Sequence, residues 1–231
     1  MNRSAASASA QSHSRTSNCC CYVFVRPSVY YVICAEVMAK VYRFWYTSGM
    51  TYYNRIFEEA IGNYGLITSS QAKAIGIPPV ELVKLAKRGR LIRLGYGVYK
   101  LSQYSPAPDG RDAYADSLAL VGEGAYLYGQ SVLAMHHLCP TNPARIYVAT
   151  PHRVRKQLNR GIVVIDSLPC ADVEWYEGLP SQSIPFAIRT SFKVIMPERI
   201  REAIATALRK ELIDQAMATK LEEELNEQET Q

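Results

Sequence analysis

Basic side chains recur between residues 84 and 93 at a spacing that suits contact with phosphate groups. Lys84, Lys87 and Arg88 are three and four positions apart, which places them on one side of a helix. Arg90 and Arg93 follow and continue the positive charge. Lysine and arginine are the side chains that hold nucleic-acid phosphates through charge-assisted hydrogen bonds. This segment therefore predicts a phosphate-binding surface.

A second cationic stretch covers residues 153–160 and holds Arg153, Arg155, Lys156 and Arg160. Such a stretch could lie over nucleic acid or hold an acidic partner. It could equally be a solvated loop with no partner. The residues alone leave these interpretations open.

The residue patterns of common catalytic centres are missing from the sequence. There is no HExxH, no GxxxxGK[ST] and no GxSxG. Asp166, Asp172, Glu174 and Glu177 could imitate a metal-dependent nuclease, but no Glu-x-Lys completes that arrangement. The six cysteines show no CxxC or Cys/His spacing. We predict no catalytic residue, no metal and no cofactor, and a nuclease stays as the weakest alternative.

Three helices are expected to position the first basic segment. The first begins at Tyr52, and the second follows the capping-box pattern Thr68-Ser-Ser-Gln71 and ends at Gly76. Pro79 suits the first turn of a third helix, which runs to Arg88. The residues that should face inward from the first helix are Tyr52, Ile56, Phe57, Ala60, Ile61 and Tyr64.

A short hairpin is expected directly after these helices. Residues 91–94 and 98–101 read as strands around Gly95-Tyr96-Gly97, whose glycines permit a tight turn. Helix, short helix, basic helix and hairpin is the order of a winged helix-turn-helix, in which the third helix enters the major groove of DNA. The residues assigned to DNA binding are Ser69, Ser70, Gln71, Lys84, Lys87, Arg88, Arg90, Arg93 and Tyr96. A protein-interaction module built on the same elements is the alternative.

The rest of the chain predicts a mixed α/β domain. Residues 106–110 read as a linker, and helices are expected over 111–121 and 130–138, with strands over 145–150, 161–165 and 172–176. From Pro197 to about Asn226 an amphipathic helix, continuous or interrupted, should turn Ile200, Ile204, Leu208 and Leu212 inward. The last dozen residues are strongly acidic and should fray as an acidic tail.

Charge and composition divide the chain in the same way. Residues 50–105 hold eight basic and three acidic side chains, whereas residues 197–231 hold five basic and nine acidic. Residues 1–49 are first Ser/Ala-rich and then apolar, without a clean signal sequence or an uninterrupted membrane span. We expect them to be disordered or to precede the true start, at Met50 or Met38. The expected organisation is an extension at 1–49, a DNA-binding domain at 50–105, a C-terminal domain at 106–220 and an acidic tail at 221–231, in a cytoplasmic α+β protein.

Several segments resemble the AbiEi-type antitoxins of type IV toxin-antitoxin systems. Residues 64–77 and 91–99 are similar to that family's N-terminal winged helix. Residues 128–138, with Ser131 and His136, look like the helix after it, although His137 stands where glycine is commoner. Residues 145–151 and 178–185 are similar to a later strand and turn. The resemblance spans residues 52 to about 215.

This resemblance implies a regulator with two activities. The winged domain would bind inverted repeats in double-stranded DNA at its own promoter and repress the operon. The C-terminal domain would counteract a nucleotidyltransferase-like toxin, with or without a stable complex. A structural role for His136 and Ser131, and no enzymatic activity, are expected on the same ground.

Overall fold

The computed structural model describes residues 52–106, 108–141, 144–166 and 172–230. The described residues all belong to one compact unit. The predictions for residues 1–49, including a start at Met50 or Met38, lie outside the described residues. Within the described residues, no helix combines the length and apolarity needed to cross a bilayer.

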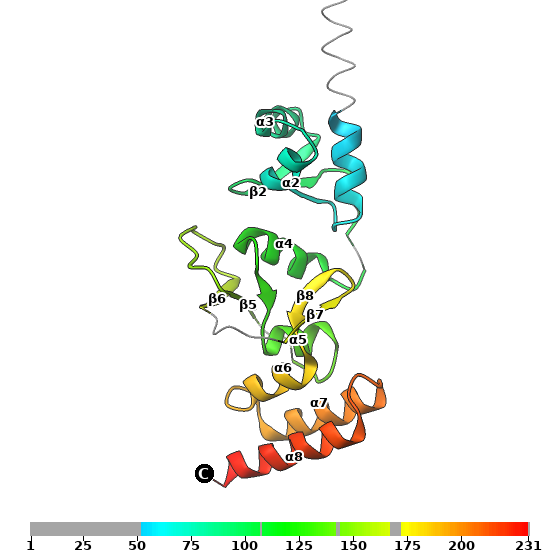
Figure 1. The fold of residues 1–231 in the computed structure, drawn as a ribbon, viewed down its shortest axis with the longest axis vertical. Coiled ribbons are helices and arrows are strands. Elements are labelled where there is room, and N and C mark those ends of the chain that lie inside the picture. Colours follow the sequence, from blue (N-terminus) through cyan, green and yellow to red (C-terminus); the bar gives the residue numbers. More distant parts are fainter. Residues whose placement is uncertain (1–51, 107, 142–143, 167–171, 231) are drawn as a thin grey trace, which may run out of the picture. The chain divides into compact units, whose positions relative to one another are not determined.

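The first group of elements consists of three helices and a three-stranded antiparallel sheet (Figure 1). In chain order they are a helix over residues 52–61, β1 (Leu66–Thr68), α2 (Ser69–Ala74), α3 (Pro79–Lys87), β2 (Leu91–Gly95) and β3 (Val98–Leu101). The central strand is β3, which pairs antiparallel with both β1 and β2. The expected order of helices and hairpin is confirmed, whereas β1 was not predicted because three residues are too few to show strand alternation.

Local signals account for where α2 and α3 begin and end. The capping box is present: the backbone N–H of Gln71 donates to Thr68 Oγ1 at 3.2 Å, and the Thr68 N–H donates to Gln71 Oε1 at 2.9 Å. Pro79 occupies the first turn of α3, where a missing N–H costs nothing. After Lys87 the chain turns through Gly89 at a φ of +71°, which favours glycine because it lacks a Cβ.

A separate hydrophobic core holds this group together. Its buried side chains include Ile56, Ile67, Ala72, Leu82 and Tyr99. The prediction that Phe57 and Ile61 face inward is wrong, since they are 37% and 56% exposed. The apolar stripe of the first helix is wider than the surface it covers, so that only Ile56 and Ala60, one turn apart, are fully buried.

The second group of elements is a mixed five-stranded sheet with five helices among the described residues (Figure 1). In chain order they are α4 (Asp112–Val121), β4 (Tyr126–Leu127), α5 (Gln130–Met135), β5 (Ile146–Thr150), β6 (Ile162–Asp166), β7 (Val173–Tyr176), β8 (Leu179–Gln182), α6 (Ile184–Ser191), α7 (Pro197–Arg209) and α8 (Gln215–Glu229). The strand order is β6-β5-β4-β8-β7, with β5 parallel to β6 and β4 parallel to β8. The mixed α+β class agrees with the prediction.

Three elements of this second group were not predicted. Strand β4 is only two residues long, and β8 and α6 fall in a segment that reads as a turn because it contains Pro180 and Pro185. Pro180 lies in β8, which is paired with β7, and Pro185 lies in the first turn of α6. The first turn of a helix tolerates proline without a tertiary partner, whereas proline within a sheet is confined to positions where its missing N–H is not needed for pairing.

The C-terminal segment contains the interruption that the sequence allowed and differs from the prediction in two other ways. The break between α7 and α8 occurs where Glu211 adopts a φ of +58°, and Asp214 caps α8 by accepting from the Met217 N–H at 2.7 Å. Leu212, expected to face inward, lies in that break and is 36% exposed. The predicted fraying is wrong, since α8 continues to Glu229 and buries Leu221 and Leu225 completely or nearly so.

The two groups of elements share apolar contacts. Leu66 of β1 and Val98 of β3 belong to the larger hydrophobic core, together with Leu118 of α4 and the apolar residues of the mixed sheet. Residues 106–110, read as a linker in the sequence, connect the groups along the chain. The core therefore continues from the small sheet into the second group.

Candidate nucleic-acid interface

The outer face of α3 carries valines as well as lysines. Val80, Val83, Lys84 and Lys87 are spaced at i, i+3, i+4 and i+7, opposite the buried Leu82 and Leu85. Val80 is 56% exposed and Val83 is 39% exposed. The prediction of a purely cationic side is therefore incomplete. The sequence already contained the signal for the valines, because they share the helical spacing of the lysines.

Lys84 is not an isolated cation on this face. Its Nζ lies 2.7 Å from Glu81 Oε1, one helical turn away, and its side chain is only partly exposed. Lys87 is exposed, and no ion pair joins it to another described residue. The strongest uncompensated charge of α3 therefore lies in its last turn and beyond, at Lys87 and Arg88, which is the C-cap residue.

Arg90 directly precedes the β2–β3 hairpin, residues 91–101, and Arg93 lies in its first strand. The Arg90 guanidinium sits 5.4 Å from the ring centroid of Tyr53, a cation–π distance that restricts its motion without removing its charge. Arg93 Nε donates to the Gly95 carbonyl at 3.2 Å. Both residues are exposed, so their remaining donors face solvent. Sequence reasoning missed Tyr53 as the partner of Arg90.

The hairpin turn presents Tyr96 and is tied to the start of α2. Tyr96 is 81% exposed, although an aromatic ring normally buries much of its surface. Beside it, the Gly97 carbonyl accepts from the Ser69 N–H at 2.8 Å. A Cβ on Gly97 would lie 3.3 Å from Ser69 Oγ at a φ of +72°, so glycine suits both the turn and this close approach. The hairpin and α2 are therefore held in a fixed relation.

The side chains at the start of α2 serve the cap. Gln71 Oε1 accepts from the Thr68 N–H, and Ser70 Oγ lies 2.9 Å from Thr68 Oγ1. Ser70 is exposed, whereas Ser69 and Gln71 are half-buried. Arg55, which the sequence analysis did not single out, donates to the Ile75 carbonyl at the end of α2. It adds another cation beside the turn between α2 and α3.

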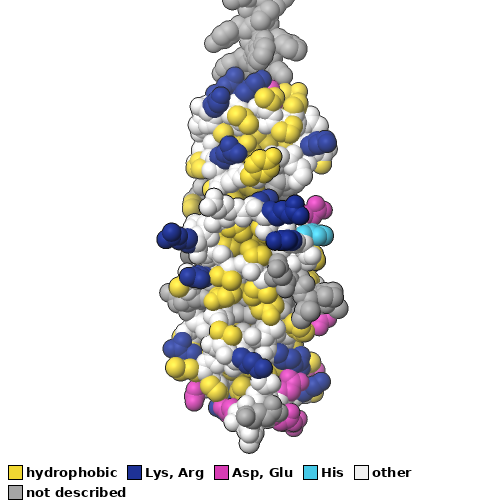
Figure 2. Space-filling view, turned by 90° about the vertical axis from the view of Figure 1, so that its left-hand side faces the viewer, with side chains coloured by type: hydrophobic (Ala, Val, Ile, Leu, Met, Phe, Trp, Pro, Cys, Tyr) yellow, Lys and Arg dark blue, Asp and Glu magenta, His cyan; other side chains and the backbone are white. Residues whose placement is uncertain are grey.

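Positive and negative side chains are unevenly distributed over the face that Figure 2 presents. On this side of the molecule the β2–β3 hairpin and the loop between β5 and β6 project outward (Figure 1). Lys and Arg side chains are spread over the whole length of the face, whereas Asp and Glu gather mainly toward its lower end (Figure 2). An anion approaching the hairpin therefore meets mostly positive charge.

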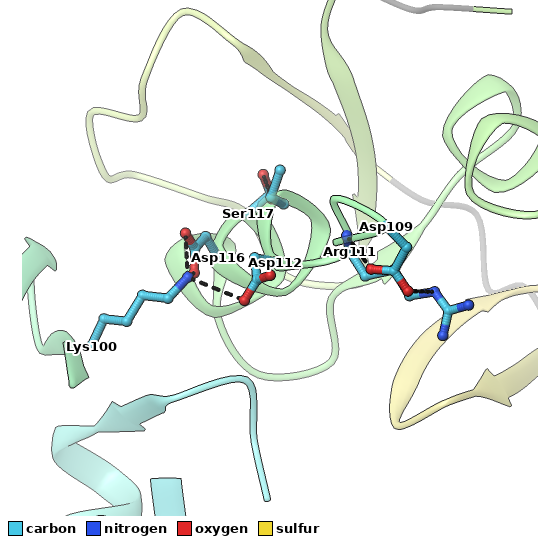
Figure 3. A network of polar contacts seen from close by, with 7 residues as sticks. Lys100, Asp109, Arg111, Asp112, Asp116 and Ser117 are labelled. Carbon is cyan, nitrogen blue, oxygen red and sulfur yellow. Dashed lines mark hydrogen bonds and ion pairs between the residues drawn. The ribbon is translucent and has the colours of Figure 1, made fainter. Parts of the chain in front are cut away.

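An ionic network joins the hairpin to α4 (Figure 3). Lys100 of β3 donates from Nζ to Asp116 Oδ1 at 2.8 Å and lies 3.6 Å from Asp112 Oδ1. All three side chains are largely shielded from water. Because two carboxylates face its ammonium group, Lys100 is held in this contact between β3 and α4. It is therefore not available to the surface that the other basic residues form.

The second cationic stretch, residues 153–160, lies in the loop between β5 and β6 and is here called the basic loop. Arg153, Arg155, Lys156 and Arg160 are exposed. Val154 and Leu158 are partly buried against the larger core. The apolar side chains therefore anchor the loop, and the charged ones project into solvent.

The acidic residues considered for a nuclease do not gather into one site. Glu177 pairs with Arg111, whereas Asp172 and Glu174 are exposed. The side chain of Asp166 lies outside the described part of the chain. Among the described residues, no group of three His, Cys, Asp or Glu side chains is placed to hold a metal ion.

His136 and Ser131 have structural environments. His136 is buried, its ring centroid lies 4.1 Å from that of Tyr176, and its carbonyl accepts from Lys210 Nζ at 2.7 Å. Burial lowers the pKa of His136 to about 4, and the positive charges of Lys210 and Arg111 act in the same direction. Ser131 is fully buried and its Oγ accepts from the Tyr147 N–H at 2.7 Å. His136 is therefore neutral at physiological pH.

Comparison with known proteins identifies the segment that carries the hairpin. Residues 54–101 match the model of a family described as transcriptional regulator, AbiEi antitoxin. No curated protein matches the chain. The matched family is a family of regulators and not of enzymes. The match begins in the first helix and ends with β3, so it covers the elements that position Lys87, Arg88 and Tyr96. Residues 54–101 are thus similar to the AbiEi transcriptional regulator and antitoxin family.

Proposed function

We propose that this protein is a DNA-binding autorepressor and the antitoxin of a type IV toxin-antitoxin system. In this proposal residues 50–105 are a winged helix-turn-helix that binds inverted repeats in its own promoter. Residues 106–220 counteract a nucleotidyltransferase-like toxin. The family match over residues 54–101 supports both activities in general. Their assignment to this promoter and to such a toxin is the proposal.

The observation that carries the DNA-binding half is the outer face of α3 with the hairpin beside it. Exposed Val80 and Val83 can contact thymine methyl groups in the major groove. Lys87 and Arg88 lie at the end of the same helix, and Arg90 and Arg93 follow toward the hairpin. With α3 in the major groove, these cations would contact the phosphate backbone on either side of it.

The hairpin would act as the wing. Its turn presents an exposed Tyr96, and its link to Ser69 keeps the turn in a fixed position relative to α2. A fixed wing makes phosphate contacts without a large loss of conformational freedom on binding. Ser70 is exposed at the start of α2, and its hydroxyl would donate to a phosphate in this proposal.

The decisive experiment measures binding of the full chain to duplex DNA from upstream of its own gene at several salt concentrations. We expect tight binding that weakens steeply with salt, because phosphate contacts release counterions. Lys87→Ala/Arg88→Ala should weaken binding by roughly tenfold, since each exposed charge contributes up to about 1 kcal/mol. The slope of log K against log salt should fall by about 2.

A matched control is Lys193→Ala/Lys220→Ala, which removes two exposed lysines from the second group of elements. Its net charge change is identical, so binding equal to that of the wild type would show that position matters. If the wild-type chain does not prefer its promoter to unrelated DNA, the autorepressor assignment is wrong.

The antitoxin half is tested in cells. A nucleotidyltransferase-like gene beside this one should inhibit growth when expressed alone, and co-expression of this chain should restore growth. Lys87→Ala/Arg88→Ala should still restore growth if neutralisation belongs to residues 106–220. Failure of the wild-type chain to restore growth would contradict the antitoxin assignment while leaving the DNA-binding result intact.

A further inference from the structure

Strand β7 lies at one edge of the mixed sheet, next to β8 (Figure 1). The two strands form an antiparallel hairpin, in which Val173 lies opposite Gln182 and Trp175 lies opposite Pro180. Among the described residues, no strand pairs with the other side of β7. An edge strand of this kind can accept a further strand from another chain.

The backbone of β7 presents hydrogen-bonding groups on its outer side. The Ser183 N–H donates to the Asp172 carbonyl at 2.9 Å, so the backbone groups of Asp172 point toward β8. In an antiparallel pair, successive residues direct their N–H and C=O alternately toward and away from the partner strand. The backbone groups of Val173 and Trp175 therefore point outward, where an added strand would bond to them.

The side chains of β7 and of the residue before it alternate between acidic and apolar. Asp172 and Glu174 are exposed, and neither forms an ion pair with a described residue. Val173 is also exposed, and Trp175 is 73% exposed. Because successive side chains of a strand point to opposite faces, the carboxylates share one face and the apolar side chains share the other. An exposed tryptophan is typical of a binding residue, because its large ring gains apolar contact when a partner covers it.

Charge decides which kind of partner suits this edge. Residues 161–188 contain four acidic side chains and no lysine or arginine. Nucleic-acid phosphates would be repelled by such a surface. In an antiparallel pairing with a second copy, the outward groups of Val173 and Trp175 would meet the same groups of that copy, which would bring Glu174 opposite a carboxylate. Like charges directly opposite each other destabilise a strand pair.

We propose that the outer edge of β7 binds an extended segment of a partner protein in which basic and apolar residues alternate. The segment adds a strand to the sheet, and its backbone bonds to Val173 and Trp175. Its apolar side chains cover the Trp175 ring, and its basic side chains face Asp172 and Glu174. This inference goes beyond the proposed function, since it involves neither DNA nor the neutralisation of a toxin.

The test uses the full chain and a synthetic peptide, Lys-Val-Lys-Val-Lys-Val, which is blocked at both ends and carries a dye. Fluorescence polarisation measures its affinity. We expect tighter binding than that of Lys-Lys-Lys-Val-Val-Val, which has the same composition without the alternation. Trp175→Ala should weaken binding by roughly tenfold or more, the usual effect of truncating a central interface tryptophan. In Trp45→Phe, which leaves Trp175 as the only tryptophan in the sequence, an unlabelled alternating peptide should shift the emission to shorter wavelengths.

A charge exchange tests the acidic face of the edge. Asp172→Lys/Glu174→Lys should weaken binding of the lysine peptide and allow binding of Glu-Val-Glu-Val-Glu-Val, because the complementary charges are reversed. The matched control is Glu222→Lys/Glu223→Lys, which changes two exposed carboxylates of α8 by the same charge and should bind the lysine peptide as the wild type does.

The backbone contact is tested by Val173→Pro. Proline removes an outward N–H and leaves the bonds between β7 and β8 in place, so binding should weaken while the thermal unfolding midpoint stays close to that of the wild type. Trp175→Ala should also keep the wild-type midpoint, because the ring is exposed.

Three results would overturn this proposal. The first is that the alternating peptide does not bind, or binds no better than Lys-Lys-Lys-Val-Val-Val. The second is equal binding by the wild type, Trp175→Ala and Asp172→Lys/Glu174→Lys. The third is a dimer in sedimentation velocity that Trp175→Ala dissociates, which would assign the edge to a second copy. Since these experiments contain no DNA and no toxin, each of these results leaves the proposed function standing.

Discussion

In the proposed binding mode, Val80 and Val83 would make apolar contacts with bases, whereas the basic residues of α3 would make ionic contacts with phosphates. Both valines are exposed on the face of α3 that also carries Lys87. Phosphate contacts do not discriminate between sequences, whereas apolar contacts to thymine methyl groups do. The two kinds of contact can therefore be removed independently.

Val80→Ser should reduce discrimination at one or two base pairs of the operator by several-fold. The physical reason is the loss of an apolar contact in the groove, with no change in charge. The measurement is competition binding with operators altered at single positions. Val80→Ile, which keeps the apolar surface, should retain the preference. A change in salt slope for Val80→Ser would mean that its effect is electrostatic and contradict this role.

His136 should make the stability of the protein depend on pH. Its pKa is lowered in the folded chain from 6.5 to about 4, so that the unfolded state binds more protons between these values. Stability is then fully present above about pH 6.5 and decreases as the pH falls toward 4. The measurement is the denaturation midpoint from pH 7.5 to 4.5.

The control for this pH effect is His136→Gln, which removes the titrating group while keeping a polar side chain. Its midpoint should be lower at pH 7.5, because the contact with Tyr176 is lost. It should also change less with pH than that of the wild type. An equal pH dependence in both proteins would assign the effect to other groups.

At the scale of elements, the start of α2 links a local sequence signal to the position of the hairpin. Thr68 closes the capping box, and Ser69 immediately after it donates to the hairpin turn at Gly97. The cap therefore stabilises a helix and positions the turn that presents Tyr96.

Thr68→Ala should lower the free energy of unfolding by about 1 kcal/mol, the usual contribution of an N-cap side chain. Chemical denaturation measures this change. Thr68→Ser, which keeps the hydroxyl, should restore most of the stability. Ser70→Ala is the neighbouring control, because Ser70 is exposed and does not accept the Gln71 N–H. Equal losses in Thr68→Ala and Ser70→Ala would contradict a specific cap.

At the scale of the whole described unit, the Lys100–Asp116 pair connects the small antiparallel sheet to α4. Both side chains are mostly shielded from water, so the interaction is stronger than an exposed surface pair. Together with the apolar contacts of Leu66 and Val98, this ion pair keeps the hairpin in place against α4.

Asp116→Ala should lower the free energy of unfolding and also weaken promoter binding, although Asp116 carries a charge that would repel DNA. The reason is that a hairpin held less firmly by α4 would no longer keep its fixed position relative to the other DNA-binding residues. A double-mutant cycle with Lys100→Ala should give a coupling of about 1 to 3 kcal/mol, as for hydrogen bonds between charged groups. A coupling near zero, or tighter DNA binding by Asp116→Ala, would contradict this role.

Helix ends and turns whose signals lie within a few residues could be predicted from the amino-acid sequence. The Thr68–Gln71 capping box, Pro79 at the start of α3, Gly89 after it and the Tyr96-Gly97 turn are interactions within a few residues, so their positions could be predicted. The basic residues of α3 and of the basic loop were visible for the same reason.

Which of these residues lie close together depends on the tertiary structure. Strands β1, β4 and β8 exist through pairing with distant strands, and two or three residues carry no periodicity of their own. The burial of Leu225 in an acidic segment depends on neighbouring packed elements. Tyr96 and Lys156 line the same cleft, and residues of α4 form part of its wall. Contacts between distant residues depend on packing the whole chain, and no local pattern encodes them.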